Sequence, residues 1–211
     1  MTRIFIADAI GLVADGLRYR LADHPDLCVM AHASTGEELL DGLTRTEVDL
    51  VMLDVSLPVK DGIDTMRALR RKFPRMLVLA YSELVEIEYV NSMLIEGAAG
   101  YLLKGGGKEE LVEAIRTTLA GGRYISPAAR ESVAKGYAHC DKRMDGEYIG
   151  LSLREREVIR LIAQERTNEE IGSILHISEE TVKTHRKHAM NKLNVRTSAG
   201  LVKYAHDRRW V

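Results

Sequence analysis

The chain is poor in features that would place it in several large classes of protein. Its 211 residues include two cysteines, Cys28 and Cys140, which are far apart and not in metal-ligand spacing. A disulfide is therefore not expected, and two free thiols are typical of a reducing compartment. No apolar run is long enough to span a membrane and no signal peptide is recognisable, so a cytoplasmic location is expected.

The chain also lacks a large excess of positive or negative charge, since its formal net charge is −1. The charge is unevenly distributed, however: 12 Lys and Arg stand against 8 Asp and Glu from residue 151 onward, and 18 against 23 before it. The basic excess thus lies in the C-terminal part, as expected if that part contacts phosphates. The length allows two small domains, each with its own core.

The first 125 residues alternate short apolar runs with helical patterns. This alternation predicts an α/β domain with a parallel sheet covered on both faces, in the flavodoxin-like (βα)5 order. The expected strands are residues 3–7, 28–33, 49–53, 76–79 and 99–103, and the expected helices are 15–22, 34–43, 63–72, 86–95 and 108–119.

Polar residues follow several of these strands at the edge where ligands bind in such sheets. Asp8 follows the first strand, Asp54 the third and Lys104 the fifth. An aspartate at the end of a central strand can act as a nucleophile toward a phosphoryl donor. A lysine at the same edge can then pair with the transferred group.

Two motifs in this half resemble those of two-component receiver domains. Asp-Val-Ser-Leu-Pro-Val-Lys-Asp-Gly at 54–62 resembles the phosphoacceptor loop, and Gly-Ala-Ala-Gly-Tyr-Leu-Leu-Lys at 97–104 resembles the fifth strand with its lysine. The resemblance implies Asp54 as phosphoacceptor, Lys104 as the phosphoryl-binding lysine and Tyr101 as the rotating aromatic residue. It also implies a Mg²⁺ site formed by Asp8, Asp54 and the backbone carbonyl of Ser56.

Two positions depart from the receiver pattern. The second acidic residue after the first strand is replaced by Ala9, so Mg²⁺ is expected to bind weakly, and no cofactor is expected to be required. The hydroxyl residue expected at the end of the fourth strand is replaced by Ala80, and Ser82 lies two residues beyond it. Losing one preorganised donor costs about 100-fold in rate. We therefore hypothesise a degenerate receiver with weak or absent phosphorylation.

The C-terminal part has the pattern of a helix-turn-helix. Residues 154–165 and 168–175 show helical spacing, and Ser178 is a plausible N-cap for a third helix. On that helix, Lys183, Thr184 and Lys187 share one face. This is the arrangement that a recognition helix needs in the DNA major groove. Arg186 and Lys192 are further candidates for contacts to the DNA backbone, Val182, Ala189 and Leu193 are expected in the core, and His185 is expected to pack there too.

This region resembles the LuxR-type helix-turn-helix of NarL/FixJ response regulators. The resemblance is carried by residues 151–158, 168–171, 181–185 and 192–193, and it implies an all-α four-helix domain that binds double-stranded DNA as a homodimer. The last helix, 197–206, offers Leu201, Val202 and Ala205 either as a dimer contact or as packing within the domain. The expected domains are 1–122, a linker with a short helix at 123–148, and 149–211.

The sequence thus predicts a transcription regulator, not an enzyme, with a sensor kinase or another protein as further partner. Three alternatives stay open. The first is a conventional phosphorylation-activated response regulator, and the second is a receiver-like domain that senses a small ligand or a protein. The third is an aspartate-based phosphohydrolase, which would need a second acid where Ser56 stands.

Overall fold

A computed structural model describes residues 1–135, 151–207 and 210–211. The chain forms two compact units, Met1–Ala138 and His139–Val211. Cys140 and most of the predicted linker lie outside the described residues. Within the described ranges, no helix is both long and apolar enough to cross a membrane.

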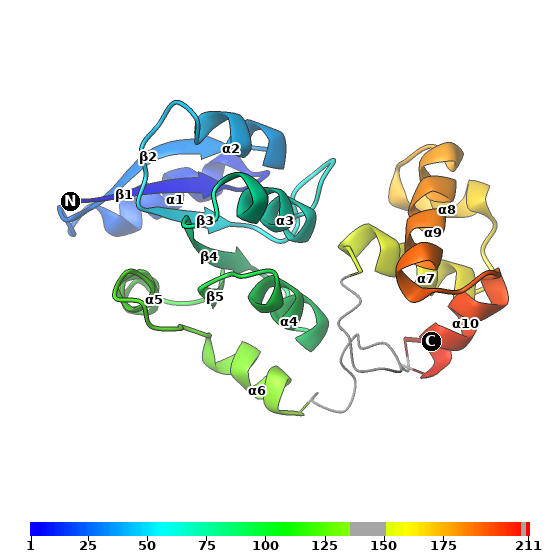
Figure 1. Ribbon diagram of the computed structural model, residues 1–211. Helices are drawn as coiled ribbons and strands as arrows, with labels where there is room; N and C mark the ends of the chain where they lie inside the picture. The colour runs from blue at the N-terminus through cyan, green and yellow to red at the C-terminus, as the bar shows by residue number, and fades with distance from the viewer. Residues whose placement is uncertain (136–150, 208–209) are drawn as a thin grey trace. The chain divides into compact units, whose positions relative to one another are not determined.

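The first unit contains a parallel sheet in the order β2-β1-β3-β4-β5 with helices on both faces, which confirms the flavodoxin-like prediction (Figure 1). The strand order reverses between β1 and β3, so the crevice at their carboxyl ends is where this fold binds ligands. The strands are β1 (Thr2–Ala7), β2 (Leu27–Ala33), β3 (Leu50–Leu53), β4 (Leu77–Ser82) and β5 (Gly100–Leu103). The helices are α1 (Gly11–Leu21), α2 (Gly36–Gly42), α3 (Gly62–Lys72), α4 (Ile87–Ile95), α5 (Lys108–Leu119) and α6 (Pro127–Lys135).

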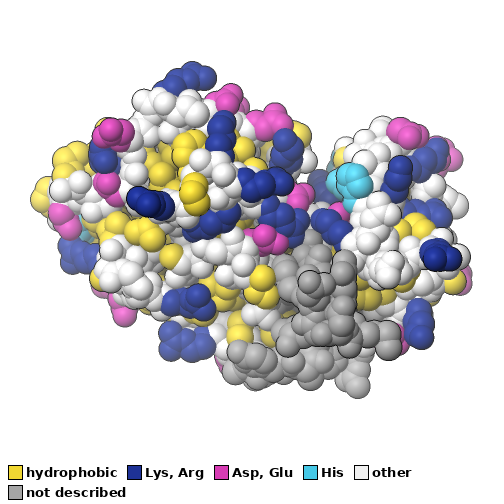
Figure 2. Space-filling model, viewed as in Figure 1, with side chains coloured by type: hydrophobic (Ala, Val, Ile, Leu, Met, Phe, Trp, Pro, Cys, Tyr) yellow, Lys and Arg dark blue, Asp and Glu magenta, His cyan; other side chains and the backbone are white. Residues whose placement is uncertain are grey.

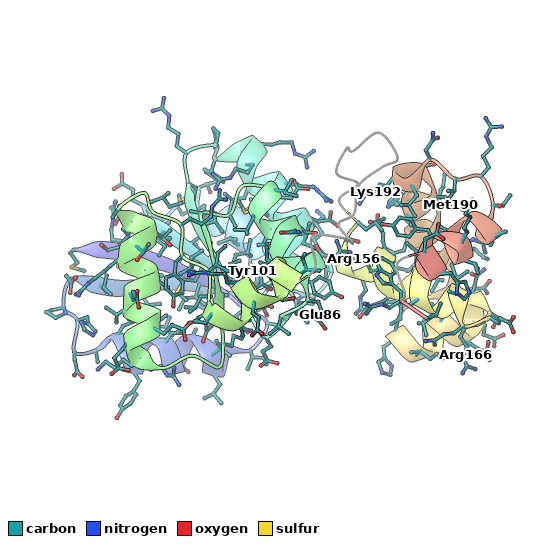
Figure 3. All side chains as sticks on the ribbon, turned by 90° about the horizontal axis from the view of Figure 1, so that it is seen from below. Glu86, Tyr101, Arg156, Arg166, Met190 and Lys192 are labelled. Carbon is teal, nitrogen blue, oxygen red and sulfur yellow. The ribbon has the colours of Figure 1, made fainter. Side chains whose placement is uncertain are left out.

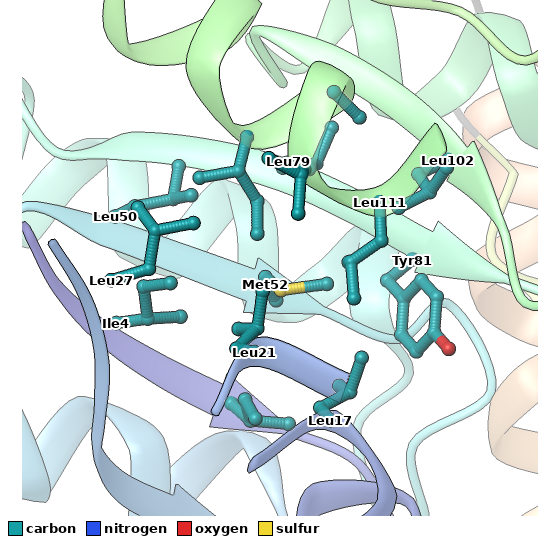
Figure 4. Packing of buried hydrophobic residues seen from close by; sticks show 14 of the residues in the cluster. Ile4, Leu17, Leu21, Leu27, Leu50, Met52, Leu79, Tyr81, Leu102 and Leu111 are labelled. Carbon is teal, nitrogen blue, oxygen red and sulfur yellow. The ribbon is translucent and has the colours of Figure 1, made fainter. Parts of the chain in front are cut away.

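The core of this unit follows from strands that are apolar on both faces. All four residues of β3 are fully buried, as expected for a central parallel strand. On one face, Ile4 and Met52 pack with Leu17 of α1 and Leu111 of α5 (Figure 4). Burying each such side chain contributes about 1.5–3 kcal/mol, which holds the strand ends in place.

The fourth strand is longer than predicted. The prediction ended it at residue 79, but β4 continues to Ser82 because Ala80 pairs with Tyr101 and Ser82 with Leu103. The predicted end of this strand was therefore wrong. Ala80 lies inside the strand and pairs on its other side with Leu53, the residue before Asp54.

The second unit consists of four helices, as predicted: α7 (Leu153–Ala163), α8 (Asn168–Leu175), α9 (Glu179–Leu193) and α10 (Ser198–Asp207). The turn between α8 and α9 is tight because His176 ends α8 in the left-handed conformation, with φ 54°. Ser178 then caps α9 by accepting a hydrogen bond from the amide of Thr181. These features form the predicted helix-turn-helix.

Both buried faces of α9 are used within this unit. Val182 packs with Val158 of α7 and Ile171 of α8. Ala189 packs in a second cluster with Leu201 and Ala205, both of which are fully buried. Leu201 and Ala205, two of the three α10 side chains that offered a possible dimer contact, are thus used for packing within the domain, and Val202 is half-buried.

Candidate functional site

The polar residues at the carboxyl edge of the sheet meet in one pocket. Asp8 and Asp54 follow neighbouring strands, and their side chains are almost fully buried, with relative exposures of 1% and 6%. The Nζ atom of Lys104, which follows β5, lies 2.6 Å from Oδ2 of Asp8 and 2.9 Å from Oδ2 of Asp54. The structure therefore brings together the three side chains predicted to form the site.

The electrostatics of this pocket are unbalanced, because two buried carboxylates share one ammonium group. Burial raises the pKa of Asp54 above its usual range, although the hydrogen bond from Lys104 opposes this. Burial also works against the charge of Lys104, but its hydrogen bonds to Asp8 and Asp54 raise its pKa overall. The pocket is therefore an anionic site with an internal cation.

The loop after Asp54 depends on close backbone approach. A Cβ atom on Gly62 would lie 2.1 Å from the carbonyl oxygen of Asp54, so only glycine fits there. Asp61 caps α3 by accepting a hydrogen bond from the amide of Asp64. Val59 has φ 67°, a conformation that favours glycine and is costly for a β-branched residue. Gly62 and Asp61 thus fix the chain that carries Asp54.

Oxygen atoms line the pocket and suit Mg²⁺ as ligands, but the protein offers only a few of them. Asp8, Asp54 and the Ser56 carbonyl would hold the ion, and Oδ1 of Asp54 is buried with no hydrogen-bond partner among the described residues. Oδ1 of Asp8 already accepts a hydrogen bond from the amide of Ile10. Ala9 adds only an exposed methyl group. Nor do the described residues include any group of three or more His, Cys, Asp or Glu suited to a metal ion.

Ser82 carries the hydroxyl that follows Ala80 on β4. It is fully buried, and its Oγ accepts a hydrogen bond from the amide of Leu84 at 3.3 Å. Tyr101, labelled in Figure 3, is also fully buried, and its hydroxyl donates to the carbonyl oxygen of Leu84 at 2.8 Å. Burial raises the pKa of Tyr101, so its hydroxyl stays protonated as a donor. The expected loss of a hydroxyl at position 80 stays a prediction.

The carboxylate imbalance predicts that Asp54→Asn stabilises the first unit by about 1 kcal/mol at neutral pH, since the variant removes a buried charge and leaves Lys104 paired with Asp8. Because the pKa of Asp54 is raised on folding, protonation stabilises the wild type as pH falls through that raised value. The advantage of the variant should thus be largest at higher pH and shrink in acid. Thermal melts of both proteins across pH measure this, and a variant less stable than wild type at neutral pH would contradict it.

A second candidate site is a groove on the recognition helix of the second unit. It has a volume of about 620 Å³, and two of the predicted DNA-binding residues, Lys183 and Lys187, lie exposed along it. Lys183 reaches Glu179 at 3.0 Å, and that contact raises its pKa. The groove is lined by Asn168, Lys183, Arg186, Lys187, Met190, Asn191, Val195 and Arg196.

The groove includes residues that sequence reasoning missed. Asn191 lies four residues after Lys187, as Lys187 does after Lys183, so the same helical spacing could have identified it. Arg196 comes from the segment after α9 and Asn168 from the start of α8, which only the fold brings to this groove. Figure 2 shows Lys and Arg on both units, so the groove rather than basic charge alone marks this candidate face.

The other predicted DNA contacts are engaged within the protein. The hydroxyl of Thr184, an exposed residue, donates to the carbonyl oxygen of Glu180 at 3.0 Å, in its own helix. Arg186 donates to Ser198 Oγ at 2.6 Å, which ties α9 to α10. Lys192, labelled in Figure 3, lies 2.7 Å from Oε2 of buried Glu155 and does not line the groove. His185 is half-buried, so it is packed only in part.

Family models match both units. The model of the response regulator receiver domain matches residues 4–116, and that of the LuxR family of bacterial regulatory proteins matches residues 150–205. The transcriptional regulatory protein MctR of Rhizobium johnstonii is 33% identical over 97% of this chain and 93% of its own length. The nitrate/nitrite response regulator NarL of Escherichia coli K12 is 30% identical over 98% of this chain and 95% of its own length.

Solved structures agree with this assignment. The RcsB response regulator of Salmonella typhimurium has a TM-score of 0.63 at 25% identity, with 98% of each chain covered. The response regulator ChrA of a haem-sensing two-component system has a TM-score of 0.54 at 29% identity, covering 100% of this chain and 98% of ChrA. Proteins of this kind are transcription factors rather than enzymes. The chain therefore belongs to the NarL/FixJ-type response regulators, which join a receiver domain to a LuxR-type DNA-binding domain.

Proposed function

We propose that this response regulator binds Mg²⁺ weakly and is phosphorylated slowly at Asp54. The observation that carries the proposal is Ala9, which supplies no oxygen to a pocket where Asp8 and Asp54 already share Lys104. Mg²⁺ usually neutralises the charge that develops during phosphoryl transfer, so a weaker metal site slows the reaction. A sensor kinase or another protein would act as its partner, in the cytoplasm.

In this proposal the receiver loses part of its metal site but keeps the residues that can pass a change in the pocket to the rest of the domain. Ser82 and Tyr101 retain the hydroxyl groups that can couple the pocket to the loop before α4. The weak step is therefore binding of the metal ion, and a modified Asp54 would still have a route to the rest of the domain.

DNA binding is assigned to the groove on α9. Lys183, Lys187 and Arg196 would attract phosphates, and Asn191 would reach base edges. Thr184, which is exposed on the same helix but does not line the groove, would also reach a base edge. A single site of this size reads few base pairs, so a homodimer on two half-sites is expected to reach adequate affinity.

A test of slow phosphorylation uses acetyl phosphate or beryllofluoride with millimolar Mg²⁺. We expect substoichiometric modification of the wild type, no modification of Asp54→Asn, and little change in DNA affinity. Mass spectrometry quantifies modified Asp54, and a gel shift with DNA upstream of its own gene cluster reports binding. Stoichiometric modification of Asp54 with a clear change in DNA affinity would instead support a conventional phosphorylation-activated response regulator.

A second candidate function is a receiver that responds to a ligand or a protein instead of phosphate. It is favoured by Tyr101, which is fully buried and whose hydroxyl is already bonded to Leu84. In that case wild type and Asp54→Asn would bind DNA equally, and a thermal-shift screen of the full chain would reveal a stabilising small ligand.

A further inference from the structure

The segment Tyr124–Ser126, which we name the edge segment, lies alongside β5 at the end of the sheet. The amide of Tyr101 donates to the carbonyl oxygen of Tyr124 at 2.8 Å, and the amide of Ser126 donates to the carbonyl oxygen of Tyr101 at 2.9 Å. A Cβ atom on Gly100 would lie 2.6 Å from the carbonyl oxygen of Tyr124, so glycine allows this approach. The edge segment thus pairs with the open side of β5.

A half-buried carboxylate, that of Glu110, fastens the edge segment to α5. Ser126 is 1% exposed, and its hydroxyl donates to Oε1 of Glu110 at 2.5 Å. The hydroxyl of Tyr124 donates to the same oxygen at 3.1 Å, and burial with the nearby Glu110 charge raises the pKa of Tyr124 to about 12. Both donors therefore stay protonated at neutral pH. The oxygen of Ser126 also accepts a hydrogen bond from the amide of Leu103 at 3.0 Å.

The same residues of β5 connect the edge segment to the acidic pocket. Leu103, which bonds to Ser126, directly precedes Lys104, whose ammonium group bridges Asp8 and Asp54. Tyr101, whose backbone bonds on both sides to the edge segment, carries the hydroxyl that bonds to the loop after β4. A displacement of Lys104 would therefore reach the edge segment through Leu103 and its hydrogen bond to Ser126. A displacement of Tyr101 would reach it through the backbone hydrogen bonds to Tyr124 and Ser126.

The edge segment leads directly into α6. Pro127 follows Ser126, and α6 packs against α4 with Ala129 fully buried (Figure 1). We propose that the edge segment, held by Glu110, transmits changes in the Asp8, Asp54 and Lys104 pocket to α6, the last described element before the DNA-binding unit. Ser126 and Glu110 are then positioning residues. This coupling does not require that Asp54 is phosphorylated.

The test uses the full chain and needs no metal, phosphoryl donor or DNA. Asp54→Asn leaves Lys104 paired with Asp8 alone, so it changes the pocket directly. Hydrogen exchange of amides in residues 128–135 should change at least about threefold between wild type and Asp54→Asn. In a Ser126→Ala background, Asp54→Asn should produce no measurable change in these amides, while amides of α2 serve as an unaffected reference.

A second pair of variants keeps the test decisive if Ser126→Ala fails to fold. Glu110→Gln retains an oxygen acceptor for Ser126 and should preserve the response, whereas Glu110→Ala should abolish it. Two outcomes would overturn the proposal: no change in α6 exchange between wild type and Asp54→Asn, or an equal change with and without the Ser126 or Glu110 side chain.

Discussion

Replacing both Lys183 and Lys187 with alanine is expected to weaken operator binding at least about 100-fold, at a cost of about 1–3 kcal/mol for each lost contact. Both side chains are exposed along the groove. Lys183 forms ion pairs with Glu179 and Glu180, both of which are exposed. Exposed ion pairs contribute little to stability, so breaking them on DNA binding costs little free energy. Lys183 is therefore free to exchange its carboxylate contacts for DNA.

Fluorescence anisotropy over a range of salt concentrations measures both the affinity and its electrostatic part. Each lost phosphate contact should reduce the slope of log K against log salt by about 0.9. Lys203→Ala is the matched control, since this exposed lysine lies on α10 and does not line the groove. Wild-type affinity in a folded double variant, or an equal loss in Lys203→Ala, would remove the groove as the DNA-binding face.

Introducing the missing acid, Ala9→Asp, is expected to lower the Mg²⁺ requirement for Asp54 phosphorylation about 10- to 100-fold. A third carboxylate beside Asp8 and Asp54 would give the ion another oxygen and compete with Lys104 for the pocket. Position 9 is exposed, so the substitution should not disturb the core. Modification by acetyl phosphate, measured as a function of Mg²⁺ concentration by mass spectrometry, gives the half-saturating concentration.

The matched control is Ala9→Asn, which has a similar size but no charge and should stay close to the wild type. In the absence of metal, Ala9→Asp should also be slightly less stable, because a third carboxylate adds like-charge repulsion, and Mg²⁺ should then raise its melting temperature more than that of the wild type. An unchanged Mg²⁺ requirement in Ala9→Asp would show that metal binding is not the weak step.

The two departures from the receiver pattern depend on the fold to different degrees. Ala9 offers no ligand atom, because a side chain's chemistry depends only on its identity. The prediction of where β4 ends failed, because that end is set by pairing with β5 through Ser82 and Leu103. The apolar run extends through Tyr81, which was a signal for the longer strand.

The DNA-binding half shows the same division. Helical spacing placed Lys183 and Lys187 on an exposed face, and it could also have identified Asn191. No local pattern could show that Lys192 pairs with Glu155, since the two are 37 residues apart and meet only when α9 packs against α7. Arg196 and Asn168 likewise reach the groove through the folding of the whole unit.

The sequence by itself determined the two fold classes, the acidic pocket and the face of the recognition helix, because strand and helix periodicity and side-chain chemistry are local properties. The tertiary structure alone decided where β4 ends, that Tyr124–Ser126 pairs with β5, and that Glu110 holds this segment to α5. These features depend on pairing and burial between segments distant in the chain, where the partner of each polar group is chosen by packing.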